Sequence, residues 1–267
     1  MRLLTLVILS LASSPALAQA VGEMVHARGE APDGAWVLDD GDRVFLIGEQ
    51  AATQAPGSLR LGTREQLEAV RGSGNGFLAD AYADFAPLGW LTVGATASYG
   101  AQDRGGTNEV SPTAYAKAQF LRQEQAGVNL AAEVQYKQVG FSPFEGDGEA
   151  ELEGMLLADR RFGRVAVTAN AVFGASLKGA ERDAELKAAV GYYARENLLV
   201  GVDALARVDL TPAGQQAAIG RSYEVVGGPM ATLKLDRVTL AALVGASAPM
   251  HASGTGGVGM LHVGYAW

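Results

Sequence analysis

The sequence predicts an all-β fold: a transmembrane, antiparallel, up-and-down β-barrel of twelve strands with a short N-terminal segment. Two observations favour this fold. From residue 77 to the C-terminus, successive segments alternate apolar and polar positions with a period of two, the pattern of strands that have one lipid-facing and one lumen-facing side. The connections between these segments are alternately short and long, like the turns and loops at the two ends of such a barrel.

Residues 1–20 predict a secretory signal peptide, cleaved after Ala18 or Ala20. Arg2 precedes an apolar run over residues 3–11, and small residues follow at 16–18. The run is shorter than the roughly 20 residues that a membrane-spanning helix needs. Since no later stretch reaches that length, residence in a membrane would require a closed barrel, which also satisfies every backbone polar group.

Residues 21–56 are expected to form an N-terminal periplasmic or lumenal segment with a short β-hairpin. Residues 35–38 and 43–47 flank the run Asp39-Asp40-Gly41-Asp42, and Asp-Gly is a strong signal for a tight hairpin turn. Both arms are shorter than the roughly 9 to 11 residues of a membrane-crossing strand. A loosely ordered leader is the alternative that the sequence leaves open.

Residues 57–267 are expected to form the barrel domain, and the stretch 59–70 decides its strand count. Leu59, Leu61 and Thr63 alternate as in a strand. The run 63–66, followed by Leu67 and Gly72, also reads as a capping box with a short helix, and such a helix would lie in the lumen. Because single-chain bacterial barrels have even strand numbers, we favour a strand.

The remaining eleven segments keep one apolar parity throughout. Pro229 removes a backbone donor from the ninth of them, where we expect a β-bulge. The segments cover residues 77–86, 90–99, 113–122, 126–138, 149–159, 164–173, 183–193, 198–208, 222–235, 237–246 and 257–267.

Aromatic residues of the apolar parity collect at the two ends of these segments, as in the girdles at the two interfaces of a membrane. A soluble β-sandwich also has alternating strands but gives no reason for two aromatic bands. The expected girdle consists of Phe77, Tyr99, Tyr136, Phe173 and Tyr223 near long loops, and Phe85, Phe120, Tyr192, Tyr265 and Trp267 near short turns or the C-terminus.

The chain ends on alternating apolar residues: Leu261, Val263, Tyr265 and Trp267. This tail resembles the C-terminal insertion signal of bacterial outer-membrane β-barrel proteins, and the whole mature chain is similar to porin-like members of that class. The resemblance implies an integral protein of the Gram-negative cell outer membrane, reached by Sec-type export and signal-peptide cleavage. It implies outer-membrane lipid and the barrel-insertion machinery as partners, the latter through the closing strand.

The polar parity predicts an acid-rich lumen. In an open lumen these charges would favour cations. In a narrow one, opposite charges would pair and fill the space, for example Glu133 with Lys117 or Glu185 with Arg207. The expected lumenal charges are Asp80, Asp84, Lys117, Glu133, Lys137, Glu151, Glu153, Glu185, Lys187, Asp203 and Arg207, and the same parity includes Asp159, Glu224 and Lys234.

Composition excludes several functions. The chain has no cysteine, so thiolate metal sites and cysteine nucleophiles are absent. A net charge of -8 argues against nucleic acid as a partner. No phosphate-binding glycine loop or metal-spaced histidine cluster is present, so no cofactor is expected. His251 and Ser253 in one loop, and His262 facing the lumen, do not assemble a nucleophile, base and orienting group. The protein is therefore expected to be non-enzymatic, with an outer-rim lipid hydrolase as an alternative.

Two function classes remain at this point. The barrel could be a structural or docking component of an envelope-spanning complex for surface motility, secretion or polysaccharide export, with periplasmic or outer-membrane protein partners, or a narrow pore. Alternatively it could be a passive, cation-preferring diffusion channel. A fold does not name a function, and a lumen without a plug would favour the channel.

Overall fold

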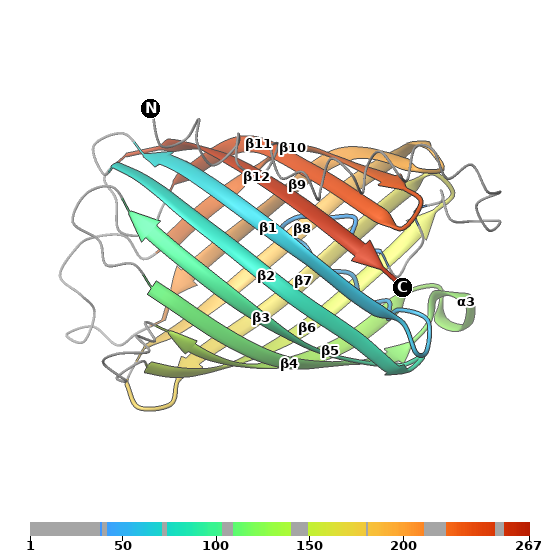
Figure 1. Cartoon of the computed structure of the whole chain (residues 1–267), viewed down its shortest axis with the longest axis horizontal. Coiled ribbons are helices and arrows are strands. Elements are labelled where there is room, and N and C mark those ends of the chain that lie inside the picture. The colour runs from blue at the N-terminus through green and yellow to red at the C-terminus, as the bar shows by residue number, and fades with distance from the viewer. Residues whose placement is uncertain are drawn as a thin grey trace, which may run out of the picture. The chain divides into compact units, whose positions relative to one another are not determined.

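The computed structural model describes Leu38 and residues 42–70, 74–102, 109–139, 149–179, 181–210, 223–248 and 254–267. In these ranges the chain forms a closed barrel of twelve antiparallel strands, which confirms the predicted fold class (Figure 1). The strands are β1 (Leu59–Val70), β2 (Gly74–Leu88), β3 (Leu91–Gln102), β4 (Glu109–Leu121), β5 (Asn129–Val139), β6 (Glu149–Phe162), β7 (Val165–Ser176), β8 (Arg182–Arg195), β9 (Leu198–Asp209), β10 (Tyr223–Leu235), β11 (Val238–Ala248) and β12 (Gly256–Ala266).

Strand β1 closes the barrel. It pairs with β12 from Arg60 opposite Ala266 to Val70 opposite Gly256, and with β2 over its whole length. The strand interpretation of residues 59–70 is therefore confirmed, and the alternative of a helix over the same residues is wrong. A helix would have left β2 and β12 with unpaired edges, which cannot face lipid.

The two ends of the barrel differ. At one end, here called the turn end, short connections join β2 to β3, β4 to β5, β6 to β7, β8 to β9 and β10 to β11. The start of β1 and the C-terminus also lie there (Figure 1), where the Trp267 amide donates to the Leu59 carbonyl at 2.9 Å. The β4–β5 turn holds helix α3 (Gln123–Ala126), which ends at Gly127 with a φ of 75°. The opposite end is here called the loop end.

The outer face is apolar, and its aromatic residues lie toward the two ends of the strands. Phe85, Phe120, Tyr192 and Trp267 are exposed near the turn end, and Tyr99, Tyr136 and Phe173 near the loop end. Of the other predicted girdle residues, Phe77 and Tyr265 are half-buried, while the side chain of Tyr223 lies outside the described part. An outer surface of this kind fits a lipid environment.

The prediction of a β-bulge at Pro229 is wrong. The register between β10 and β11 is the same before and after this residue, from Gly227 opposite Ala246 to Met230 opposite Leu243. The backbones pass so closely here that a Cβ added to Gly245 would lie 2.1 Å from the Gly227 carbonyl oxygen. Glycines therefore let the strands stay in register where proline interrupts the pairing.

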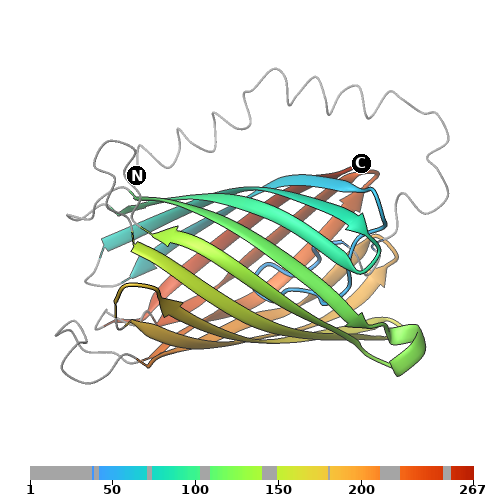
Figure 2. The ribbon, with the colours of Figure 1, turned by 90° about the horizontal axis from the view of Figure 1, so that it is seen from below.

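The barrel interior contains part of the N-terminal region. Residues 42–58 are here called the inner segment: residues 42–54 run inside the barrel, as the blue trace visible between the strands in Figure 2, and the exposed residues 55–57 lead to the start of β1. Residues 43–47 form no strand, so the second arm of the expected hairpin is absent, and the first arm lies outside the described residues except for Leu38. Among the described helices, none has the length and apolar character to span a membrane.

Candidate lumenal binding site

The inner segment is anchored by a buried carboxylate halfway along β9. Asp203, which is 0% exposed, accepts hydrogen bonds from three successive backbone amides: Leu46 at 2.8 Å, Ile47 at 2.7 Å and Gly48 at 3.0 Å. Successive amides that converge on one anion form a nest. Because bonds to a charged acceptor are about twice as strong as neutral ones, Asp203 is the principal anchor of this segment.

Three further lumenal side chains hold the next residues of the segment. Thr168 and Asn170 on β7 donate to the carbonyl of Glu49 at 2.6 and 2.8 Å, and Asn170 accepts from the Glu49 amide at 2.7 Å. Asp159 on β6 accepts from the amides of Ala51 and Ala52. The segment thus crosses the lumen from the β9 wall to the β6 wall on side-chain bonds.

The lumen is not uniformly polar, which corrects the expectation from the charged positions. Val44, Phe45, Leu46 and Ile47 pack into an apolar core with inward residues of the barrel wall. Hydrophobic residues occupy inward positions because the inner segment covers them there. The wall residues of this core include Leu199, Val226, Met230, Leu243, Val258 and Met260, from β9 to β12.

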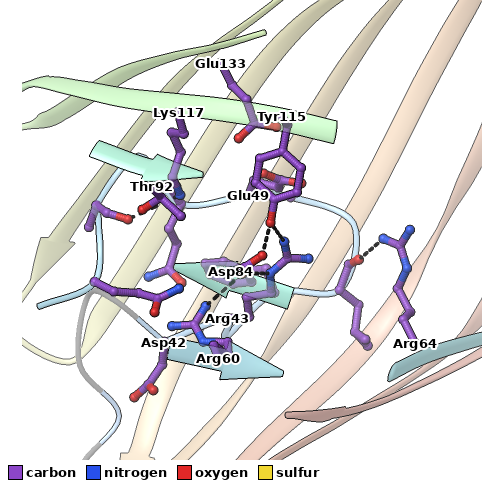
Figure 3. A pocket seen from close by; sticks show the side chains of 16 residues that line it. Asp42, Arg43, Glu49, Arg60, Arg64, Asp84, Thr92, Tyr115, Lys117 and Glu133 are labelled. Atoms are coloured by element: carbon purple, nitrogen blue, oxygen red, sulfur yellow. Dashed lines mark hydrogen bonds and ion pairs between the residues drawn. The ribbon is translucent and has the colours of Figure 1, made fainter. Parts of the chain in front are cut away.

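A polar pocket remains on the other side of the inner segment. Its lining comes from the inner segment and strands β1 to β5, and Figure 3 shows charged side chains from both converging on it. The charged and hydroxyl side chains in the lining are Asp42, Arg43, Glu49, Arg60, Arg64, Asp84, Thr92, Tyr115, Lys117 and Glu133.

Arg43 and Asp84 form the centre of this pocket. The Arg43 guanidinium lies 3.5 Å from the Asp84 carboxylate and donates to the Tyr115 hydroxyl at 3.2 Å. Tyr115 in turn donates to Asp84, and Arg60 lies 4.0 Å from the same carboxylate. Tyr115 can lie flat across the wall because its neighbour is Gly94, where a Cβ would come within 2.4 Å of the ring.

Two charges on the inner segment are firmly maintained. Burial lowers the pKa of Arg43, but the carboxylates of Asp84, Glu49 and Glu133 outweigh it, so the pKa lies above its ordinary value. Burial alone would raise the pKa of Glu49. The nearby positive charges have the larger, opposite effect, so the pKa lies below its ordinary value; these charges are Arg43, Lys117, Lys187 and Arg64. Both groups are charged at neutral pH.

Lys117 and Glu133 lie opposite each other on β4 and β5, but they form no ion pair of the kind expected. The Lys117 ammonium instead donates to the carbonyls of Gln50 and Ala52, at 3.0 and 3.4 Å. One oxygen of Glu133 accepts from the Gln135 amide at 2.6 Å. Lys117, which the strand register places opposite Glu133, is therefore bound by the inner segment instead.

A second charged group lines the lumen toward the loop end. Here Arg207 lies 2.8 Å from Glu185, as expected, and 2.6 Å from Asp183. This group, here called the vestibule network, holds three cations and five carboxylates. Its further contacts are Arg207 with Glu224, Lys187 with Glu185, and Lys137 with Glu151 and Glu153.

Two other lumenal carboxylates, Asp80 and Asp42, form ion pairs. Asp80 accepts from Arg64 at 2.6 Å, and Lys234 donates to Asp42 at 2.8 Å. His262 is buried, and its Nε2 lies 2.7 Å from the Tyr82 hydroxyl. His251 and Ser253, the other residues weighed for hydrolysis, lie outside the described residues. Within the described ranges no group of three His, Asp or Glu side chains could hold a metal ion.

Sequence reasoning missed Arg43, Glu49 and Arg60 as lumenal residues, because it left the inner segment unplaced and the parity of β1 ambiguous. A signal was present. Asp203 is an inward carboxylate in mid-strand whose register partners are Ala189 and Gly228, so no side chain directly opposite it on the neighbouring strands can pair with it. It is the residue that binds three amides of the inner segment.

The comparisons with known proteins show what the fold resembles. No family model matches the chain, and no curated protein matches its sequence. An outer-membrane channel from Pseudomonas putida F1 has a TM-score of 0.62 at 11% identity, covering 86% of this chain and 100% of that one. At this identity, the two proteins are similar in fold alone.

Two porins are also similar to this chain in fold. The NanC porin has a TM-score of 0.58 at 6% identity, and the KdgM porin in complex with disordered oligogalacturonate has 0.52 at 10%. Each alignment covers 77% of this chain and 98% of the porin. The chain therefore has the barrel architecture of outer-membrane porins and channels.

Proposed function

We propose that this protein is an integral outer-membrane channel for small polar solutes, whose lumen is restricted by its own inner segment. The observation that carries the proposal is the path of residues 46–52, which cross the lumen from Asp203 to Asp159 and leave a polar pocket beside β1 to β5. An apolar outer face supports the membrane location, and the shared fold of porins and channels supports conduction.

The restriction distinguishes this proposal from a wide diffusion pore. One side of the lumen is filled by the apolar residues of the inner segment, while the pocket side is lined by charged groups and hydroxyls. A hydrated solute would pass the polar side, because the apolar side offers no hydrogen bonds to replace its water. Conduction would then depend on how firmly the inner segment is bound.

The vestibule network supports a preference for cations. Its five carboxylates and three cations carry an excess of two negative charges at the loop end. Rings of like charge in a lumen raise the local concentration of the opposite ion. The expected selectivity is therefore modest and falls as salt screens these charges.

A docking or anchoring role is the second candidate, and the packed apolar core of the lumen favours it. A barrel that is filled and held by buried hydrogen bonds can carry a partner without conducting. In this case the N-terminal region would be the element that reaches protein partners of an envelope-spanning complex, for example in secretion or export.

Single-channel conductance in a planar bilayer separates the two candidates. The intact mature protein is expected to give small, cation-selective steps, and a variant without residues 21–56 larger ones. Because this deletion could impair folding, a variant with Asp159→Asn and Asp203→Asn, which loosens the segment and keeps the chain length, is measured beside it. Silence from all three folded proteins would refute the channel and favour the docking role.

A further inference from the structure

The polar pocket has unused hydrogen-bond acceptors. Within the part of the chain that the structure describes, Oε2 of Glu133 and Oγ1 of Thr92 have no hydrogen-bond partner. Both residues are deeply buried, at 2% and 3% exposure, and both side chains point into the pocket (Figure 3). A buried carboxylate oxygen without a donor is costly, which indicates a place for a ligand that donates.

Glu49 adds a third acceptor from the inner segment. Its backbone is held by Thr168 and Asn170, and its carboxylate lines the same pocket near Glu133. The three acceptors thus come from three separate parts of the fold: Thr92 from β3, Glu133 from β5 and Glu49 from the inner segment.

The positive groups of the pocket are already engaged. Arg43 is shared between Asp84 and Tyr115, Arg64 donates to Asp80 and to the Leu46 carbonyl, and Lys117 donates to two carbonyls of the inner segment. An anionic ligand would have to displace these contacts. The unpartnered oxygen of Glu133 can only accept when the carboxylate is charged, so a ligand beside it has to donate.

We propose that this pocket binds a primary ammonium group, held by Glu133, Glu49 and Thr92. An ammonium of this type carries one positive charge and three N–H donors, which matches three acceptors. The pocket already accommodates one such group, since the Lys117 ammonium is held there by the carbonyls of Gln50 and Ala52. A quaternary ammonium has the charge but no donor, and is not expected to bind.

The site deepens the proposed function, because a pocket beside the inner segment would select small amine-bearing solutes from other cations. That use in selection rests on the channel proposal. Binding itself does not, so it can be measured on protein that conducts nothing.

Isothermal titration calorimetry of the refolded full-length protein in detergent tests the site. Methylammonium is titrated as the probe, with tetramethylammonium and potassium as ions of equal charge that lack N–H donors. Saturable binding of one methylammonium per chain is expected, with neither control ion binding measurably in the same range. Saturable binding of either control ion with similar affinity, or no saturable heat from methylammonium, would overturn the proposal.

Glu133→Gln is the decisive variant. It keeps the oxygen that accepts from Gln135 and removes the charge and the unused acceptor, so methylammonium affinity should fall at least tenfold. The matched control is Glu224→Gln, a carboxylate of the vestibule network, which should bind like the parent. Equal binding by both variants would refute the site. Methylammonium binding without conductance would refute the channel and support the site. Conductance without methylammonium binding would support the channel and refute the site.

Discussion

Replacing Asp203 by Ala should release the inner segment while the barrel stays folded. Asp203 accepts three backbone N–H bonds from this segment and is fully buried. Bonds to a charged group are worth about 1.5–3 kcal/mol each, so their loss sums to more than 4 kcal/mol before the segment relaxes. Because freed amides can regain water once the segment moves, we expect about 3 kcal/mol, or roughly a 100-fold weaker docking equilibrium.

Trypsin reports this change directly, because Arg43 lies within the inner segment and is half-buried. In folded protein, cleavage after Arg43 should accelerate about 100-fold in Asp203→Ala and less in Asp203→Asn, which keeps one acceptor oxygen. Asp183→Asn, in the vestibule network, is the control and should cleave at the parent rate. An unchanged rate in Asp203→Ala, with the barrel shown to be folded, would refute the anchoring argument.

Three further predictions concern charged side chains. The pKa of Glu49 is below its ordinary value of 4.5, so its stabilisation of the docked segment is present above pH 4.5 and is lost as the pH falls below it. Conductance should rise in this acid range, and it should rise less in Glu49→Gln than in the parent, because the anchoring carboxylates Asp203 and Asp159 are present in both proteins. An identical acid response in both proteins would exclude Glu49. Glu65 lies halfway along β1 opposite Leu261, on the apolar outer face. Replacing it with Leu should therefore raise the free energy of unfolding in lipid by about 1 kcal/mol. A free energy of unfolding below that of the parent, measured by urea titration, would contradict a lipid-facing position. Removing two of the three cations of the vestibule network with Lys137→Gln and Lys187→Gln should increase the cation preference in reversal-potential measurements. An unchanged reversal potential would place these charges off the conduction path.

The strands could be predicted because each spans the barrel with one side in lipid and one in the lumen. That geometry forces the period-two pattern on every strand, and the ambiguous β1 was predicted from the even strand number of single-chain barrels. The helix alternative at Thr63 to Gln66 failed because local capping preference is worth about 1 kcal/mol, whereas leaving two strand edges unpaired in lipid costs several kcal/mol per backbone group.

The inner segment could not be predicted from the same pattern. Asp203 and Asp159 bind it through backbone amides, which every residue carries, so the sequence of residues 46–52 shows no matching motif. The pattern of residues 43–47 predicts a hairpin arm, but Val44 to Ile47 pack into the lumen as part of an apolar core and form no strand. The pocket depends on this placement, because Arg43 and Glu49 belong to the segment.

The most direct test of a lumen restricted by the inner segment is a disulfide between the segment and the wall. A Cβ added to Gly48 would lie 3.6 Å from the Cβ of Ala189 on β8, within the usual 3.5–4.5 Å for a disulfide, and the chain has no other cysteine. Thr168→Ser removes the methyl group that would crowd the new side chain. Mass spectrometry of the oxidised Gly48→Cys, Ala189→Cys, Thr168→Ser variant should find the two peptides joined, and two free, alkylatable thiols in folded protein would contradict the account.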